Sequence, residues 1–91
     1  MTFKPLGMDQ TLYDFLLPYR TAAPEPVAQR KTNPRPFRQD DTLRRLEWRG
    51  WLQWIKTVPI GPGTIFTAAE IDAYYRLTDD GARAMERFEN G

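Results

Sequence analysis

The stretch DDTLRRLEWRGWLQWIKTV, residues 40–58, decides the fold because it predicts a helix followed directly by a strand. Its leading aspartates suit a helix start, where carboxylates accept hydrogen bonds from free backbone amides and oppose the positive end of the helix dipole. Leu43 and Leu46 recur at helical spacing and predict a buried side, with the two arginines between them on the opposite side. The sequence therefore predicts a helix over residues 40–51 with a basic solvent face.

The residues after this helix predict a strand and a turn. Residues 51–58 are rich in aromatic and β-branched side chains, which are typical of strands. Residues 59–64, PIGPGT, are dense in turn formers and predict the end of that strand. We expect Trp51 and Trp54 to be core or half-buried residues of the strand, since rings of this size are usually buried.

Residues 67–78 allow two interpretations. Their first four residues, TAAE, match a capping box and favour a helix over residues 68–77. The aromatic run AYYRL favours a strand over residues 73–77 instead, with one tyrosine on each face. A strand would complete a hairpin, whereas a helix would give an acidic helix–turn–helix unit with the final helix. Both interpretations stay open from the sequence alone.

Amphipathic helices are predicted near both ends of the chain. Residues 9–19 form the first, which Pro18 should end or kink because proline lacks an amide. Thr78 caps the second, over residues 79–89, and two aspartates follow it in the first turn. The apolar stripes are Leu12, Phe15, Leu16 and Tyr19 in the first helix, and Gly81, Ala84, Met85 and Phe88 in the second.

A proline-rich basic segment, residues 21–39, separates the first helix from the central one. Its four prolines forbid a long helix and favour extended backbone, so we expect a loop or an arm. One short helical turn fits around residues 27–31.

Two motifs in this order resemble the bacterial winged helix-turn-helix family of multiple-antibiotic-resistance-type and PadR-like regulators. They are LxxLExxGWL at residues 43–52, similar to the exit of the recognition helix, and YRLTDDG at residues 75–81, similar to the return strand and the cap of the last helix. The resemblance covers residues 40–88. It implies an α+β fold: a single small winged-helix domain over residues 1–91, with three or four short helices and a two-stranded β-wing.

The resemblance also implies a nucleic-acid surface. It places Arg44 and Arg45 on the face that the family offers to the DNA major groove, where arginine can contact guanine or phosphate. Arg35 and Arg38 in the preceding arm would clamp the backbone or enter a minor groove, and Lys56 near the wing would meet a neighbouring phosphate. Alternatively, these basic residues only solubilise an exposed surface.

Trp48 suggests a different class of partner. Helical spacing aims its ring away from the buried leucines. The ring then either folds back under the proline-rich arm or stands exposed among arginines, which is typical of a protein-interface hot spot.

Composition excludes several kinds of chemistry. The 91 residues contain no cysteine and no histidine, so there is no imidazole base, thiol nucleophile, disulfide or histidine–cysteine zinc site. No metal ligand set, cofactor motif, signal sequence or apolar run of membrane-spanning length is present. We therefore expect a cytoplasmic protein that is not an enzyme and does not enter a membrane.

Charge is unevenly divided along the chain. The net charge is +1, yet residues 1–57 carry ten basic and six acidic side chains, whereas residues 58–91 carry three and six. The first part is therefore the one suited to an anionic partner. We expect a DNA-binding protein, either a transcriptional regulator or a phage or mobile-element accessory factor. The alternative is a protein-interaction module, an inhibitor or adaptor of a larger host complex, which uses the Trp48 surface. Monomer and small homodimer both remain possible.

Overall fold

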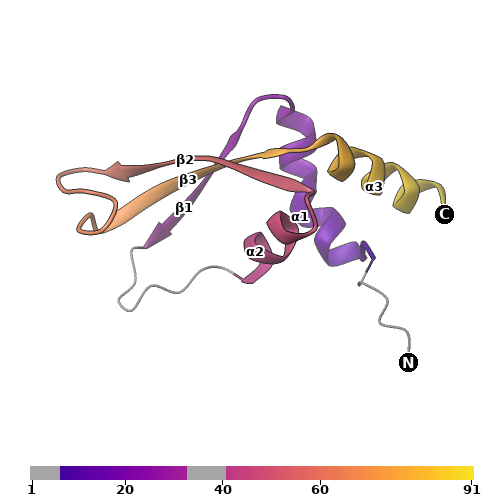
Figure 1. Ribbon diagram of the computed structural model, residues 1–91, viewed down its shortest axis with the longest axis horizontal. Helices are drawn as coiled ribbons and strands as arrows, with labels where there is room; N and C mark the ends of the chain where they lie inside the picture. The colour runs from indigo at the N-terminus through magenta and orange to yellow at the C-terminus, as the bar shows by residue number, and fades with distance from the viewer. Residues whose placement is uncertain (1–6, 33–40) are drawn as a thin grey trace.

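A computed structural model gives the fold of the protein and describes residues 7–32 and 41–91. Within these ranges the chain forms three helices and three strands in an α+β arrangement, as the sequence predicts (Figure 1). In chain order the elements are α1 (Gln10–Ala22), β1 (Val27–Thr32), α2 (Asp41–Trp48), β2 (Leu52–Ile60), β3 (Glu70–Leu77) and α3 (Asp79–Asn90).

The strands form one antiparallel sheet in the order β1-β3-β2. β2 and β3 make a long hairpin, in which Leu52 pairs with Leu77 at the base and Ile60 with Glu70 near the tip. β1 pairs with the other side of β3. The helices lie at one end of the sheet, and the hairpin projects away from them (Figure 1). The hairpin therefore has little helix cover along its outer half.

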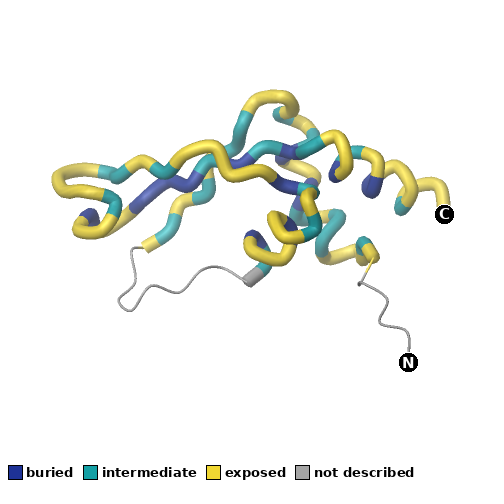
Figure 2. Tube along the Cα trace, viewed as in Figure 1, coloured by how far each residue is buried: buried dark blue, intermediate teal, exposed yellow. Residues whose placement is uncertain are grey.

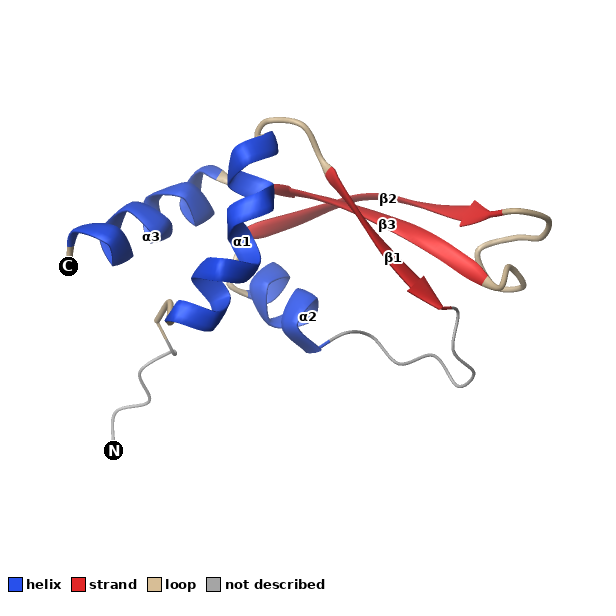
Figure 3. Ribbon diagram, turned by 180° about the vertical axis from the view of Figure 1, so that it is seen from behind, coloured by secondary structure: helices blue, strands red, loops and turns tan. Residues whose placement is uncertain are grey.

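The core lies where the helices meet the base of the sheet (Figure 2). α1 packs against β1, β3 and α3, and its place against the sheet is clearest from behind (Figure 3). Alternate residues of β3 point into this core, since side chains in a strand alternate between faces. The buried core residues are Leu16, Tyr19, Leu43, Leu46, Leu52, Ala73, Tyr75, Leu77 and Met85.

α1 continues through its proline. The Asp9 carboxylate caps the helix by accepting a 2.8 Å hydrogen bond from the Leu12 amide. The prediction that Pro18 ends the helix is wrong, because α1 continues to Ala22, and a kink at Pro18 stays the other predicted outcome. Proline removes the bond to the carbonyl four residues back, that of Asp14, and its ring crowds the same carbonyl. Both residues are exposed, so water can satisfy that carbonyl.

β1 corrects the prediction for residues 21–39. Residues 27–32 form a strand, neither a loop nor a helical turn, while residues 33–39 lie outside the described ranges. The sequence VAQRKT has little strand character of its own, and long-range pairing with β3 supplies its backbone hydrogen bonds. The sheet consequently has three strands, and the prediction of a two-stranded wing is wrong.

β2 confirms the predicted strand and extends it by two residues. The expected break at residue 59 is wrong, because Pro59 lies within the strand. β2 is an edge strand, and an edge position tolerates the missing amide of proline. Trp51 is half-buried, but Trp54 is 49% exposed, so the expectation of a core role for Trp54 is also wrong.

β3 resolves the ambiguous residues 67–78 in favour of a strand, and the helix over residues 68–77 is wrong. The hydroxyl of Thr67 accepts a 2.8 Å hydrogen bond from the Thr64 amide in the hairpin loop, so it stabilises a turn and caps no helix. Tyr75 is buried and Tyr74 is half-exposed, as alternation in a strand requires.

α3 begins at the predicted cap. The Thr78 hydroxyl accepts a 3.0 Å hydrogen bond from the Gly81 amide and itself donates to the carbonyl of Gly50. This threonine thus joins the start of α3 to the exit of α2. The predicted apolar stripe is confirmed, since Gly81, Ala84 and Met85 are buried and Phe88 is half-buried.

Candidate nucleic-acid interface

α2 is held to the core by one side only. Leu43 and Leu46 are buried, whereas Arg44 and Arg45 between them are exposed. The helix is short, but apolar burial of the leucines fixes its rotation about its own axis. The predicted division of α2 into a core side and a basic side is therefore confirmed.

Gly50 follows the end of α2, which is shorter than the helix predicted over residues 40–51 because it stops at Trp48. Its φ of +76° is the left-handed conformation that glycine adopts without a side-chain clash. The Gly50 amide donates to the Glu47 carbonyl at 3.0 Å, and the Trp51 amide donates to the Leu46 carbonyl at 3.0 Å. This pair of bonds is a Schellman motif, which satisfies the last carbonyls of a helix and turns the chain away from it. The chain then enters β2 directly.

The two central arginines of α2 are available for an external partner. Neither Arg44 nor Arg45 forms an ion pair with another described residue. Arg49 is more constrained, because its guanidinium lies 5.5 Å from the ring centre of Trp51 and donates to the Arg45 carbonyl at 3.5 Å. Arg44 and Arg45 together make the basic side of α2.

Trp48 stands next to these arginines at the end of α2 and is 88% exposed. The ring is therefore exposed, as one of the two alternatives predicted from the sequence has it. A solvated indole beside guanidinium groups has the composition of an interface anchor.

Lys56 is not on α2 and does not extend its basic side. It lies in β2 opposite Tyr74, with its ammonium nitrogen 4.9 Å from the centre of the Tyr74 ring. Arg35 and Arg38 lie outside the described residues. The structure therefore brings together two of the five predicted basic contacts, Arg44 and Arg45.

Arg30 adds to the basic count of the sequence but is already paired. Its guanidinium donates to both carboxylate oxygens of Asp72 at 3.1 and 3.2 Å, and Glu70 lies 3.8 Å away. The hydrogen bond to Asp72 raises the pKa of Arg30. Charge counting missed this pair because the two residues are distant in sequence and meet only through the β1–β3 register.

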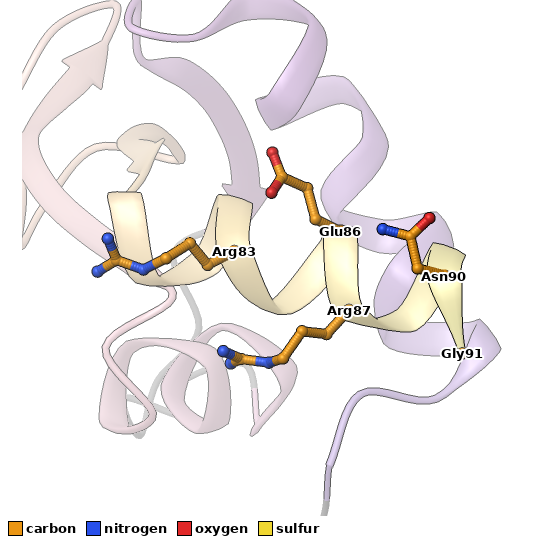
Figure 4. Close-up of a pocket in the computed structure, with 5 residues that line it drawn as sticks. All are labelled: Arg83, Glu86, Arg87, Asn90 and Gly91. Atoms are coloured by element: carbon orange, nitrogen blue, oxygen red, sulfur yellow. The ribbon is translucent and has the colours of Figure 1, made fainter.

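Charged groups also line a shallow hollow of about 380 Å³ at the C-terminal end of α3. Arg83 and Arg87 project from one side of the helix, and Glu86 and Asn90 from another (Figure 4). Arg83 pairs with Asp80 on its own helix. Such a mixed and open surface has no converging set of groups that would fix a ligand.

The described residues offer no group of metal-ligating side chains, and none of their helices is long and apolar enough to cross a membrane. Comparisons with known proteins found no matching family model, curated protein or solved structure. The functional proposal therefore depends on the exposed side chains themselves.

Proposed function

We propose that the protein is a small, non-catalytic winged-helix protein that binds duplex DNA through the basic side of α2. The observation that carries this proposal is the placement of Arg44 and Arg45. Both are exposed and unpaired with any described acid, and each is next to a leucine fixed in the core. A guanidinium placed in this way can make paired hydrogen bonds to a guanine edge or to a phosphate.

The order of elements supports the same proposal. α2 leads through Gly50 into the β2–β3 hairpin, in the order in which a recognition helix leads into the wing of the family that the sequence resembles. β1 adds a third strand on the far side of β3, away from the α2–β2 connection. The added strand thus leaves the proposed DNA-binding helix uncovered.

In the proposed mechanism, different basic residues supply the affinity for DNA and the recognition of its base sequence. Basic groups would gain affinity by displacing counterions from the phosphates, while Arg44 and Arg45 would read bases in the major groove. Arg35 and Arg38 would add backbone contacts from the arm that precedes α2. The proposed role is that of a cytoplasmic transcriptional regulator or a phage or mobile-element accessory factor.

Fluorescence anisotropy with a labelled mixed-sequence duplex of about 25 base pairs, long enough for one helical turn and its flanks, tests this proposal. Affinity should fall steeply between about 50 and 200 mM salt, and Arg44→Ala and Arg45→Ala should each weaken binding by about 1–3 kcal/mol while most of the salt dependence remains. Arg83→Ala is the matched control, because it removes an exposed arginine from α3. Absence of salt-dependent binding, or equal weakening by the control, would contradict the proposal.

Trp48 favours a second candidate function, binding of a protein partner through the same helix. Its ring is the most exposed large apolar side chain among the described residues. In this case Trp48→Ala would abolish binding of the partner and leave DNA affinity unchanged, whereas Arg44→Ala would leave the partner bound. The opposite pattern in the two variants would support DNA binding instead.

A further inference from the structure

Trp48 lies on the same side of α2 as the two central arginines. At about 100° per residue, the direction of Trp48 falls between those of Arg44 and Arg45. All three point away from the buried Leu43 and Leu46. Residues three and four apart are neighbours on the surface of a helix, so the indole has both guanidinium groups beside it. We call Arg44, Arg45 and Trp48 the tryptophan–arginine surface.

The ring of Trp48 is free to receive a flat partner. It is 88% exposed, and no described residue forms a ring contact or a hydrogen bond with it. The guanidinium of Arg49, the next cation along the chain, lies over the Trp51 ring instead. A partner can therefore cover the Trp48 ring without displacing a contact between described residues.

The surroundings of Trp48 favour a nucleic-acid base over a protein surface. Apart from Trp48, every large apolar side chain that is exposed in the described residues lies outside α2. An anchor in a protein interface needs surrounding contacts that exclude water, and charged side chains are depleted at the centre of such interfaces. The exposed neighbours of Trp48 on the helix are Arg44, Arg45 and Glu47. A base, by contrast, is covered by one ring, and flanking arginines attract the anionic DNA around it.

A continuous duplex offers little to this ring. In the major groove a base pair presents its edge, whereas its two faces are covered by the neighbouring pairs. An indole has a single polar group, the N–H donor, so it can make few hydrogen bonds to base edges. Stacking requires the face of a base, and an unpaired base exposes one. Trp48 is therefore suited to DNA in which a base is unpaired next to a duplex.

The end of α2 that carries Trp48 is better suited to an uncharged base than to a phosphate. The carbonyl end of a helix has a partial negative charge, which repels phosphate. The neighbouring Glu47 is exposed and forms no ion pair with another described residue. Arg44 and Arg45 lie one turn earlier and attract the anionic duplex. The charges along α2 thus separate a position for the duplex from a position for a base.

We propose that Trp48 stacks on an unpaired base while Arg44 and Arg45 bind the adjoining duplex, so that the preferred DNA is a duplex with a single-stranded tail. This inference rests on the proposed DNA binding by α2 and narrows it to one class of DNA. Stacking on an aromatic side chain tolerates any sequence, because every base has a flat face. The preference is therefore for the structure of the DNA and not for a particular unpaired base.

Fluorescence anisotropy of the full chain with three labelled DNAs tests this proposal. All three share a duplex of about 20 base pairs, which is about two helical turns. One is blunt, the second carries a tail of about five unpaired nucleotides, and the third carries a tail of the same length with abasic sugars. The two tails have the same number of phosphates, so they differ only in their bases. The native chain should bind the duplex with the base-carrying tail about tenfold more tightly than the duplex with the abasic tail.

Substitutions at Trp48 separate stacking from simple apolar contact. Trp48→Leu keeps an apolar side chain but removes the ring, so the two tailed duplexes should bind equally. Trp48→Phe keeps a ring and should retain a preference of about threefold or more for the base-carrying tail. Arg44→Ala is the matched control, because it should weaken binding of all the DNAs by a common factor and leave the preference unchanged. Circular dichroism confirms that each variant is folded.

The outcomes distinguish this inference from the proposed DNA binding. Equal and salt-dependent affinity of the native chain for all three DNAs would overturn the stacking of Trp48 and leave the proposed binding of duplex DNA in place. No binding to any of the DNAs would overturn both. A preference for the base-carrying tail that survives Trp48→Leu would also overturn the stacking, because another residue would then hold the base and Trp48 would remain available to a protein partner.

Discussion

Arg20 in α1 and Glu89 near the end of α3 form an ion pair in which a guanidinium nitrogen lies 2.6 Å from a carboxylate oxygen. The second carboxylate oxygen accepts a 2.9 Å hydrogen bond from the hydroxyl of Tyr13. The Tyr13 ring also packs against that of Phe88, with ring centres 5.0 Å apart. These contacts join the two terminal helices of the described chain.

Glu89 should make the stability of the protein sensitive to acid. The Arg20 hydrogen bond, followed by that from Tyr13, lowers the pKa of Glu89. A carboxyl with a lowered folded pKa contributes stability above its unfolded pKa, about 4.3, and that stability is lost as the pH falls through the lower folded value. Glu89→Gln should therefore unfold at a lower temperature than the native chain at pH 7 and at nearly the same temperature at pH 2.5. Equal differences at both pH values, measured by thermal circular dichroism, would contradict this role.

Gly81 should not tolerate a methyl group, although it lies in a helix. A Cβ at this position would collide with the backbone carbonyl of Trp51 and come within 2.7 Å of a methyl group of Leu77. Overpacking of this kind costs about 1–3 kcal/mol and outweighs the gain of about 1 kcal/mol in helix propensity. Gly81→Ala should thus lower the free energy of unfolding in urea. Gly7→Ala is the control and should change it by less than about 0.5 kcal/mol, since a Cβ there has no neighbour within 4 Å.

Substitutions at Gly50 measure the cost of a left-handed backbone conformation by itself, because an added side chain would not clash with any neighbour. A Cβ at Gly50 would meet nothing within 4 Å, but its φ of +76° is unfavourable for any residue with a side chain. Gly50→Ala should therefore cost about 1–2 kcal/mol, and Gly50→Asn should cost less because asparagine adopts this conformation more readily. Chemical denaturation measures both. Equal stability of the alanine and native proteins would show that α2 does not need the Schellman motif.

Removal of Arg30 from the Arg30–Asp72 ion pair should destabilise the protein more than replacement of Asp72. The Asp72 side chain is 11% exposed, whereas that of Arg30 is 60% exposed. Arg30→Ala leaves a buried carboxylate without its cation and should lower the free energy of unfolding, while Asp72→Asn leaves only a solvated guanidinium and should lower it less. Lys31→Ala on the same strand is the control. The reverse order of stabilities in denaturation experiments would contradict this explanation.

Local sequence patterns were sufficient for the elements whose signals are local. Leu43 and Leu46 predicted the buried side of α2, and Thr78 predicted the start of α3, because spacing and capping are properties of a few consecutive residues. Arg44 and Arg45 were placed correctly for the same reason.

Features that depend on distant residues were not predictable in this way. β1 was missed because its strand character comes from pairing with β3 and from the Asp72 partner of Arg30. Pro18 and Pro59 were expected to interrupt a helix and a strand. The helix accommodates Pro18 because that position is exposed, and the strand accommodates Pro59 because it lies at the sheet edge. Only the tertiary structure reveals these two facts.

Titration of the isotope-labelled protein with a mixed-sequence DNA duplex, followed by amide chemical shifts, tests the central claim most directly. Our account predicts that the largest shifts occur in α2, at Arg44, Arg45 and Trp48, and that they disappear in the Arg44→Ala/Arg45→Ala variant. Shifts confined to the β2–β3 hairpin or to α3, or none at DNA concentrations that saturate the anisotropy signal, would contradict it.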